Sequence, residues 1–473
     1  MKRKLLKLEQ LARRLEPTQA ERKASRDQVV GYAEIFLNKI EREKAFHYES
    51  DKGIGLLSSP VEERPMPIKK VIQLIRKNVD NQSINPASGG HLGYIPGGGI
   101  YYSALGDYLA AVTNRYAGVF YAGPGAVRME NMLTRWVAEL IGFPRSSAGN
   151  LTSGGSVANL ISICTARDAK FINSRNVTNS VIYLSSQSHH SLEKAIRIAG
   201  LRECILRYVP MDALYRMDAG QLAKRINEDK SAGLNPFLVI ATAGSTDVGA
   251  IDPLHKIASI AKRNKLWFHI DAAYGGFFML TREGKEKLKG IEKADSLVVD
   301  PHKGLFMPYG IGVVLIRNKK QMNATHYYEA HYMQDALSSN EESSPADLSP
   351  ELSKHFRGMR MWLPLKLHGV KPFRSCLEEK LLLAKYFYRE IKKLGFETGE
   401  VPDLSVVAYR YVPKKGKADA FNRKLMDIVQ RDGRVYISST TLNGNFMLRL
   451  ACLNFRTHLY HVDLLLSILG RNI

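Results

Sequence analysis

The chain has 473 residues, of which 45% are hydrophobic and 24% charged, and this composition excludes disordered and fibrous classes. Single hydrophobic cores seldom grow to this length, so we expect one large domain with a smaller partner. The net charge of +22 favours anionic partners. Because the basic residues are spread along the chain without a nucleic-acid-binding motif, a solvated basic surface is favoured over nucleic-acid binding.

Targeting and redox features are few. No apolar run is long enough for a membrane anchor, and the first residues, MKRKLLKLEQ, lack the apolar stretch of a secretory signal, so we expect a cytoplasmic protein. Four cysteines lie far apart, with no C-x-x-C pair, which argues against both a disulfide framework and a zinc site: Cys164, Cys204, Cys376 and Cys452. Reduced thiols and no metal site are therefore predicted.

Residues 1–48 carry a helical pattern, with a break expected at Pro17. Leu5, Leu8 and Leu15 recur at helical spacing among basic residues, and a second apolar stripe follows. Such helices need a partner. Glutamates dilute the basic face, so packing on another subunit is favoured over binding to a membrane surface.

From residue 100 to about 317 the pattern alternates between short β-branched runs and helical stretches. Helices are expected at 192–200 and 253–264. The strand-like runs are VIYL (181–184), FLVIATAG (237–244), LWFHIDAAYGG (266–276), SLVVDPHK (296–303) and GVVLIR (312–317). This alternation predicts an α/β fold with a mainly parallel sheet covered on both faces. Ligands bind such sheets at the carboxyl ends of the strands.

The remaining segments suggest where the domains divide. Residues 85–99, NPASGGHLGYIPGGG, are too rich in Gly and Pro for regular structure, and the polar residues 335–355 predict a mobile surface loop. A second αβ pattern begins after about residue 366. We therefore expect an N-terminal helical segment with a pocket loop (1–99), a large domain (100–365) and a small C-terminal domain (366–473).

Two strand ends carry the most informative side chains. Asp271 follows the apolar run LWFHI, and Lys303 follows SLVVDPH. Either residue alone could be an ordinary turn residue. Because they end strands of successive βα units, we expect both side chains to face the same crevice. A lysine that condenses with an aldehyde, opposite an acid that keeps a pyridine nitrogen protonated, is the arrangement expected for pyridoxal 5′-phosphate (PLP).

Other strand ends supply the rest of a cofactor site. Gly154, Gly155 and Ser156 precede an apolar-periodic helix, whose first N–H groups can cradle a phosphate. His189 and His190 follow VIYL, either as a helix cap or as a ring lying on the cofactor and moving protons. Ser245 and Thr246 end another strand, as turn residues or as hydroxyls that reach the cofactor.

With HIDAAYGG and DPHKG, the chain resembles the group II PLP-dependent amino-acid decarboxylases, which include the aromatic-L-amino-acid, histidine and glutamate decarboxylases. The likeness runs from about residue 66 to the C-terminus. It implies the PLP-dependent transferase-like fold (fold type I) and a homodimer with the active site at its interface.

The resemblance also implies roles for individual residues. In the cofactor site they are Lys303 as the Schiff-base lysine, Asp271 as the partner of the ring nitrogen, Ala273 against the ring, His189 stacked on it, Thr246 near the ring, and Gly154, Gly155, Ser156 and His302 around the phosphate. In the substrate pocket they are Tyr94, Pro96 and Gly97, with Arg456 after a one-residue shift in alignment.

Two departures from the family pattern affect the expected chemistry. Gly304 follows the lysine where relatives carry a bulky residue, which predicts a pocket of different shape. The loop tyrosine that protonates the substrate carbon after carbon dioxide leaves is absent from the aligned position near Pro345. Tyr332, or else Tyr327 or Tyr328, is the candidate to replace it.

The expected activity is PLP-dependent decarboxylation of an L-amino acid to an amine. Tyr94, Ile100, Tyr101 and Tyr102 favour an aromatic or apolar substrate, although the likeness to glutamate decarboxylases leaves an acidic one open. The nearest alternative is decarboxylation coupled to oxidative deamination, which releases an aldehyde. A PLP-dependent carbon–carbon lyase is more distant, and a basic nucleic-acid-binding protein leaves Lys303 and Asp271 unexplained.

Overall fold

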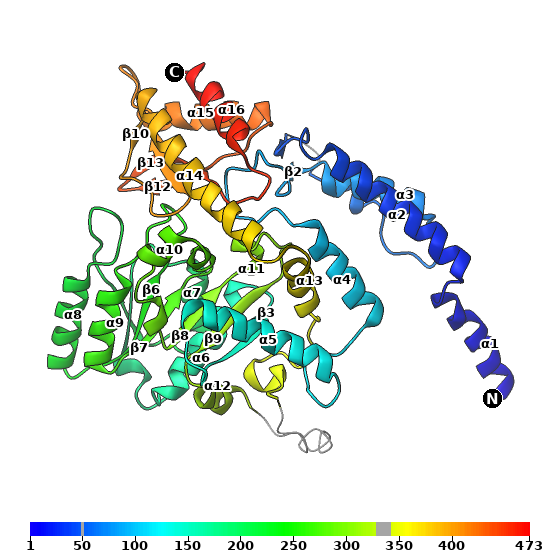
Figure 1. Ribbon diagram of the computed structural model, residues 1–473, viewed down its shortest axis with the longest axis horizontal. Coiled ribbons are helices and arrows are strands. Elements are labelled where there is room, and N and C mark those ends of the chain that lie inside the picture. The colour runs from blue at the N-terminus through cyan, green and yellow to red at the C-terminus, as the bar shows by residue number, and fades with distance from the viewer. Residues whose placement is uncertain (49–51, 328–341) are drawn as a thin grey trace.

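A seven-stranded sheet forms the centre of the protein (Figure 1). This computed structural model describes residues 1–48, 52–327 and 342–473. The strand order is β3-β9-β8-β7-β6-β4-β5, and within it only β9 runs antiparallel to its neighbours. The strand bounds are β3 Ala148–Thr152, β4 Ser180–Leu184, β5 Ile205–Tyr208, β6 Asn235–Thr242, β7 Trp267–Asp271, β8 Ser296–Val299 and β9 Gly312–Ile316. The predicted mainly parallel α/β sheet is confirmed.

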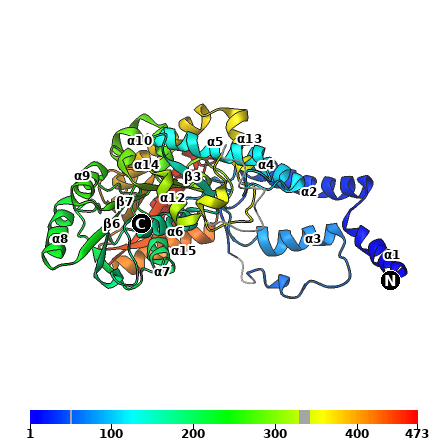
Figure 2. The same ribbon diagram turned by 90° about the horizontal axis from the view of Figure 1, so that it is seen from below.

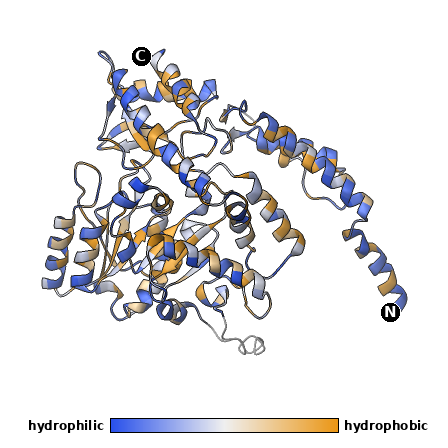
Figure 3. Ribbon diagram, viewed as in Figure 1, coloured by the Kyte–Doolittle hydropathy of each residue, from blue (hydrophilic) through white to orange (hydrophobic). Residues whose placement is uncertain are grey.

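Helices cover both faces of this sheet. One face packs against α5 (Pro124–Ile141), α8 (Ala219–Ser231), α9 (Leu254–Asn264) and α14 (Lys371–Lys393). The other packs against α6 (Gly155–Ala169), α7 (His190–Ile198) and α12 (Lys319–His326). Strand β7 shows the alternation, since Phe268 and Ile270 face the first layer while Trp267 faces the second. Both faces are therefore mainly apolar, and the strands of the sheet are mostly hydrophobic in Figure 3.

A smaller antiparallel sheet lies towards the C-terminus, in the order β10-β11-β13-β12. Its strands are β10 Glu397–Thr398, β11 Val406–Arg410, β12 Ser438–Leu442 and β13 Asn445–Ala451. Helices α14, α15 (Ala418–Asp432) and α16 (Leu459–Gly470) bury one apolar cluster against it. Helices α4 (Tyr101–Thr113), α10 (Arg282–Lys287), α11 (Pro301–Gly304) and α13 (Gly358–His368) complete the main body.

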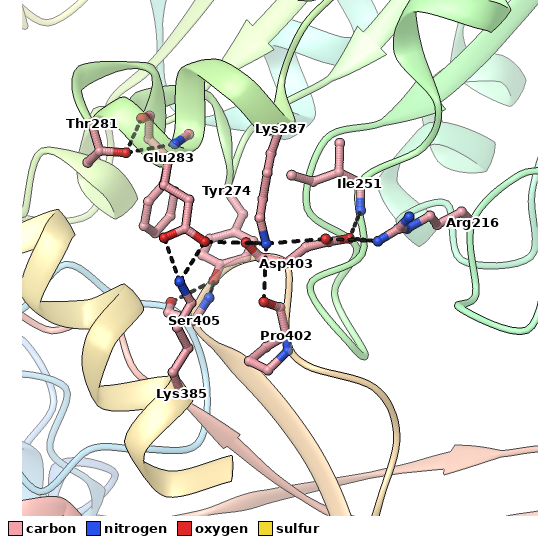
Figure 4. Close-up of polar contacts among 12 residues, drawn as sticks. Arg216, Ile251, Tyr274, Thr281, Glu283, Lys287, Lys385, Pro402, Asp403 and Ser405 are labelled. Atoms are coloured by element: carbon pink, nitrogen blue, oxygen red, sulfur yellow. Dashed lines mark hydrogen bonds and ion pairs between the residues drawn. The ribbon is translucent and has the colours of Figure 1, made fainter. Parts of the chain in front are cut away.

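An ion-pair network joins the two sheets (Figure 4). Asp403, just before β11, accepts hydrogen bonds from Arg216 at 2.8 Å and from the Ile251 backbone at 3.2 Å, and Lys287 lies 3.4 Å away. Nearby, the Tyr274 hydroxyl lies 2.6 Å from the Ser405 hydroxyl. The start of the small sheet is therefore tied to loops of the large one.

The N-terminal helices extend away from this body (Figures 1 and 2). They are α1 (Lys2–Ala12), α2 (Gln19–Lys39) and α3 (Ile68–Ile75), and none of them has a buried residue. The break after Pro17 is confirmed, because Thr18 and Glu21 form a capping box that starts α2. Apolar side chains such as Leu5 and Leu8 stay more than half exposed.

The prediction of a mobile surface loop at 335–355 is wrong for its second half. Residues up to 341 lie outside the described part, but Pro345–Leu348 forms a 3-10 helix whose ends are buried. Lys354 is also buried, with its ammonium 2.8 Å from the Glu130 carboxylate. Polar residues misled the prediction because their partners lie far away in the sequence.

Within the described residues, no helix is both long and apolar enough to cross a membrane. The same residues contain no group of three or more His, Cys, Asp or Glu side chains placed to hold a metal ion. All four cysteines are free, and Cys204 and Cys452 are buried.

Candidate active site

A cavity of about 240 Å³ lies at the carboxyl ends of the parallel strands. Its lining comes from the ends of β3, β4, β6, β7 and β8 and the loops after them, with Ile95 added from the loop at residues 85–99. It contains every residue that the sequence assigned to the cofactor: Gly154, Gly155, Ser156, His189, Thr246, Asp271, Ala273, His302 and Lys303. Residues that are distant in the sequence thus meet in one place.

Lys303 reaches this cavity from the short helix α11 after β8. Its ammonium lies 2.9 Å from Oδ2 of Asp300, a carboxylate that is almost completely buried. His302 lies 3.7 Å from the same oxygen, and its Nδ1 is bonded to the Ile311 carbonyl oxygen. Burial lowers the pKa of His302. Asp300 therefore holds the free lysine amine inside the cavity.

Asp271 is the last residue of β7 and is buried. Its two carboxylate oxygens each accept a hydrogen bond at 3.1 Å, one from the Asn159 amide and one from the Ala273 backbone N–H. These two donors hold the carboxylate in one orientation, and Asp271 lines the cavity. Asp271 can therefore face a cation there.

The glycine turn before α6 forms the third part of the site. Gly154 has a φ of 149°, which glycine adopts readily and other residues avoid. A Cβ added to Gly155 would lie 3.0 Å from Oδ2 of Asp300, so a side chain there would crowd this carboxylate. The first N–H groups of α6 have no partner within the helix, which makes this turn a cradle for an anion.

His189 caps the start of α7 at another side of the cavity. Its Nδ1 lies 2.7 Å from the Ser191 hydroxyl and also accepts from the Ser191 backbone N–H at 3.2 Å. Burial lowers the pKa of the His189 ring, which favours the neutral form. The His190 ring lies 4.1 Å away, centroid to centroid. His189 is therefore held in one orientation.

Comparison of the amino-acid sequence with known proteins identifies the family of this chain. Residues 34–412 match the model of the pyridoxal-dependent decarboxylase conserved domain. The chain belongs to the pyridoxal-dependent decarboxylase family. It is 33% identical over 415 residues to an aromatic-L-amino-acid decarboxylase of Bacillus atrophaeus, covering 86% of each chain. It is 27% identical over 430 residues to a phenylacetaldehyde synthase of Petunia hybrida, covering 86% of this chain and 84% of the synthase.

The fold of this decarboxylase family member also matches solved structures. The crystal structure of Oryza sativa TDC with PLP and tryptamine superposes with a TM-score of 0.90 at 24% identity, covering 97% of this chain and 98% of that one. The fold is therefore that of the PLP-dependent decarboxylases, as the sequence predicted.

The cavity fits PLP, the cofactor of this family. An amine for the aldehyde, a carboxylate for the ring nitrogen and an anion cradle lie around one space. Two buried oxygens that line it, Oδ1 of Asp300 and Oγ1 of Thr242, have no hydrogen-bond partner among the described residues. Buried polar atoms are seldom left unpaired, so both are available to a bound group.

The predicted substrate residues lie beside this cavity rather than in it. Pro96 and Gly97 line a second cavity of about 210 Å³, which shares His302 with the first. Tyr94 is half exposed and packs near the Tyr436 ring. The Arg456 guanidinium donates to the carbonyl oxygens of Ala87 and Gly98, so it supports the backbone of this loop. A direct role for Arg456 with substrate stays a prediction.

The two departures from the family pattern have different outcomes. A Cβ added to Gly304 would lie 2.6 Å from Cβ of buried Phe277, so the space beside this glycine is filled and does not enlarge the cavity. Tyr332 lies outside the described residues, as does Tyr328. Pro345, at the aligned position, is buried, and its carbonyl oxygen accepts from the Asn150 amide.

Sequence reasoning missed three buried groups around the site. Asn159 binds Asp271, as described above. Asp252 accepts from the backbone N–H groups of Met217 and Thr242, both at 2.7 Å, and burial raises its pKa to about 6. Arg449 donates to the carbonyl oxygens of Thr246 and Gly93, and so ties two cavity loops together. For Asn159, the one available signal was a polar residue among the apolar residues of SVANLIS.

Proposed function

We propose that this protein uses PLP to decarboxylate an aromatic L-amino acid to its amine. The observation that carries the proposal is the meeting of Lys303, Asp271 and the glycine cradle in one cavity at the carboxyl edge of the sheet. The amino-acid sequence of the Bacillus aromatic-L-amino-acid decarboxylase supports the same reading, since one third of the aligned residues are identical.

The protein's own groups have distinct tasks in this reaction. Lys303 binds the cofactor through its amine, and Asp300 keeps that amine in place when it is free. Asp271 would pair with the protonated ring nitrogen, and two hydrogen bonds hold its carboxylate in place. The bound cofactor supplies an electron sink for the bond that breaks. Burial favours the neutral form of His189, and its Nδ1 accepts from the Ser191 backbone N–H, so Nε2 carries the ring proton and can donate it in the cavity.

The second cavity supports an aromatic substrate. Its lining consists mainly of apolar or backbone surface from Pro86, Ala87, Pro96, Gly97, Gly98, Gly99, Met307, Pro308 and Tyr309, with His302 as the shared wall. Among the described residues that line it, none has an acidic or basic side chain apart from that histidine. A flat apolar side chain gains by leaving water there, whereas the side-chain carboxylate of an acidic substrate would lose its hydration without an ionic partner in the lining.

An aldehyde product is the second candidate. Pro345 offers no acidic proton at the position where relatives carry a tyrosine, and the Petunia relative is a phenylacetaldehyde synthase. Tyr327 is half exposed at the end of α12, and Tyr332 lies among the residues that are not described. We retain Tyr332 as the proposed proton donor for the amine-forming reaction.

We also propose a homodimer, which the exposed apolar stripe of α1 and α2 supports. Figure 3 displays hydrophobic residues along these helices, well away from the body of the chain. A twofold partner would cover them. Light scattering of the purified protein tests this, with a monomer mass at micromolar concentration counting against it. A cytoplasmic location stays a prediction from the sequence.

The test of the activity is a substrate panel with several products followed at once. L-Tryptophan, L-tyrosine, L-phenylalanine and L-glutamate are each supplied to the PLP-loaded protein, and carbon dioxide, amine, aldehyde and peroxide are measured. Amine and carbon dioxide in equal amounts from an aromatic substrate support the proposal. Aldehyde with peroxide supports the second candidate, and turnover of L-glutamate alone contradicts the aromatic assignment.

A further inference from the structure

A buried polar row lies beneath the cavity on one face of β7. Trp267, His269 and Asp271 alternate along this strand, so all three side chains point towards α6. Trp267 and His269 are fully buried. Only Asp271 has a role in the proposed reaction, and a polar histidine in the middle of a core needs its own explanation.

Hydrogen bonds connect this row into one chain. The Trp267 indole N–H donates to the Ser296 hydroxyl at 2.8 Å, and Ser296 Oγ lies 2.8 Å from Nδ1 of His269. On the other side of the ring, Nε2 of His269 lies 2.9 Å from Oδ1 of Asn159. The Asn159 amide nitrogen then donates to Oδ2 of Asp271 at 3.1 Å.

The chemistry of each group sets the direction of this chain. The Asp271 carboxylate only accepts, so Asn159 must turn its N–H towards it and its carbonyl oxygen towards His269. That oxygen also only accepts, so Nε2 of His269 carries a proton. Indole N–H only donates, which leaves the Ser296 hydroxyl proton for Nδ1. Burial lowers the pKa of His269 to about 4, so the ring is neutral with its single proton on Nε2.

Asn159 has a second branch that reaches His189. Its amide nitrogen lies 3.4 Å from the Ser191 hydroxyl, and that hydroxyl lies 2.7 Å from Nδ1 of His189. One amide hydrogen thus serves Asp271 and the other serves Ser191. Asn159 is 1% exposed, so water does not compete for these hydrogens.

We propose that Asn159, oriented by the neutral Nε2–H form of His269, is the positioning residue that sets both Asp271 and His189 in the active site. The proposal rests on the cofactor roles proposed for those two residues. Turning the amide over would set oxygen against the Asp271 carboxylate and nitrogen against the His269 N–H. A single buried amide therefore decides which atoms Asp271 and His189 present to the cavity.

The first test observes the protonation of the His269 ring in the wild-type protein. Protein labelled with ¹⁵N in histidine is observed by NMR between pH 6 and pH 8, without and with PLP, and His269→Gln assigns the resonance. The account expects a neutral ring protonated at Nε2 at every pH. A ring protonated at Nδ1, or an imidazolium near pH 7, would overturn it whatever the enzyme catalyses.

The second test compares variants of α6. Asn159→Ala is expected to weaken PLP binding about tenfold or more, because it removes a hydrogen bond to a charged group. Asn159→Asp, which sets a second carboxylate against Asp271, is expected to weaken binding and also to move the pH midpoint of the cofactor absorption band. Ser162→Ala is the matched control, since this buried hydroxyl of the same helix bonds to the Ala158 carbonyl oxygen within the helix.

Thermal unfolding of the apoproteins separates positioning from packing. If Asn159→Ala lowers the melting temperature but leaves PLP affinity and the pH midpoint as in Ser162→Ala, Asn159 has only a structural role and the inference is wrong. If the wild-type protein forms no cofactor band, the proposed function itself fails. The NMR result still decides the inference if the Asn159 variants do not fold.

Discussion

The buried ion pair of Lys354 and Glu130 anchors the chain that follows residue 341 to helix α5. Breaking this pair tests how much it contributes to stability. The Lys354 ammonium lies 2.8 Å from Glu130 Oε2, and it donates to Asn150 Oδ1 at 2.8 Å and to the Leu151 carbonyl oxygen at 3.0 Å. Glu130 Oε1 accepts from the Gly358 backbone N–H at 3.0 Å. The ammonium therefore donates two hydrogen bonds and also forms an ion pair with Glu130, and both side chains are sealed from water.

Lys354→Met should destabilise the protein by about 3–5 kcal/mol, since it leaves the Glu130 carboxylate buried without its cation. Adding Glu130→Gln to this variant should recover about 2 kcal/mol, because the uncharged amide keeps an acceptor for Gly358 and removes the lone charge. Because β3 continues into the Gly154 turn, Lys354→Met should also weaken PLP binding.

Urea unfolding followed by tryptophan fluorescence measures these changes, since Trp136 lies in α5, the helix of Glu130, and Trp362 lies in α13, which follows Lys354 in the chain. Lys371→Met, at an exposed lysine that starts α14, is the control and should change stability by less than about 0.5 kcal/mol. A loss below about 1 kcal/mol for Lys354→Met, or a double variant less stable than the single one, would refute the reasoning.

Three further predictions concern other contacts. Burial lowers the pKa of His269 to about 4, whereas an unfolded histidine takes up a proton near pH 6.5. The free energy of unfolding should therefore fall by up to about 3 kcal/mol between pH 6.5 and pH 4. His269→Gln should reduce this pH dependence, as measured by urea unfolding at each pH. Asp403→Ala leaves Arg216 and Lys287 without their shared anion, so it should cost about 2 kcal/mol, and less in 1 M salt; an equal loss at both salt concentrations would contradict the ionic account. Gly97→Ala places a Cβ 2.4 Å from Phe306 Cα and should lower PLP affinity about tenfold, unlike Gly31→Ala, whose Cβ meets nothing within 4 Å among the described residues.

The sequence predicted the fold and the cofactor residues for a physical reason. Buried parallel strands are continuous apolar runs, so FLVIATAG and SLVVDPHK stand out, and the residue that ends each run must lie at the same edge of the sheet. Asp271 and Lys303 can therefore be paired from the amino-acid sequence alone. Gly154 could also be found from the sequence, because Gly154, Gly155 and Ser156 stand directly before a helix with periodic apolar residues.

What the sequence could not predict depends on contacts between distant segments. Lys354 looked like part of a polar loop because its partner Glu130 is on α5, far earlier in the chain. Asn159 sits in an apolar helix, and nothing local indicates that its amide meets both β7 and α7. Gly304 suggested a pocket of different shape, but Phe277 fills the space beside it. Local patterns carry no information about such pairings.

The central claim is that Lys303 and Asp271 hold PLP in one cavity, and the absorption spectrum of the purified protein with added PLP tests it most directly. The account predicts a visible band that sodium borohydride fixes onto Lys303 and that Lys303→Ala abolishes, while Asp271→Asn retains the band but binds the cofactor more weakly. A wild-type protein with no band at saturating PLP, or a Lys303→Ala variant that keeps it, would contradict the account.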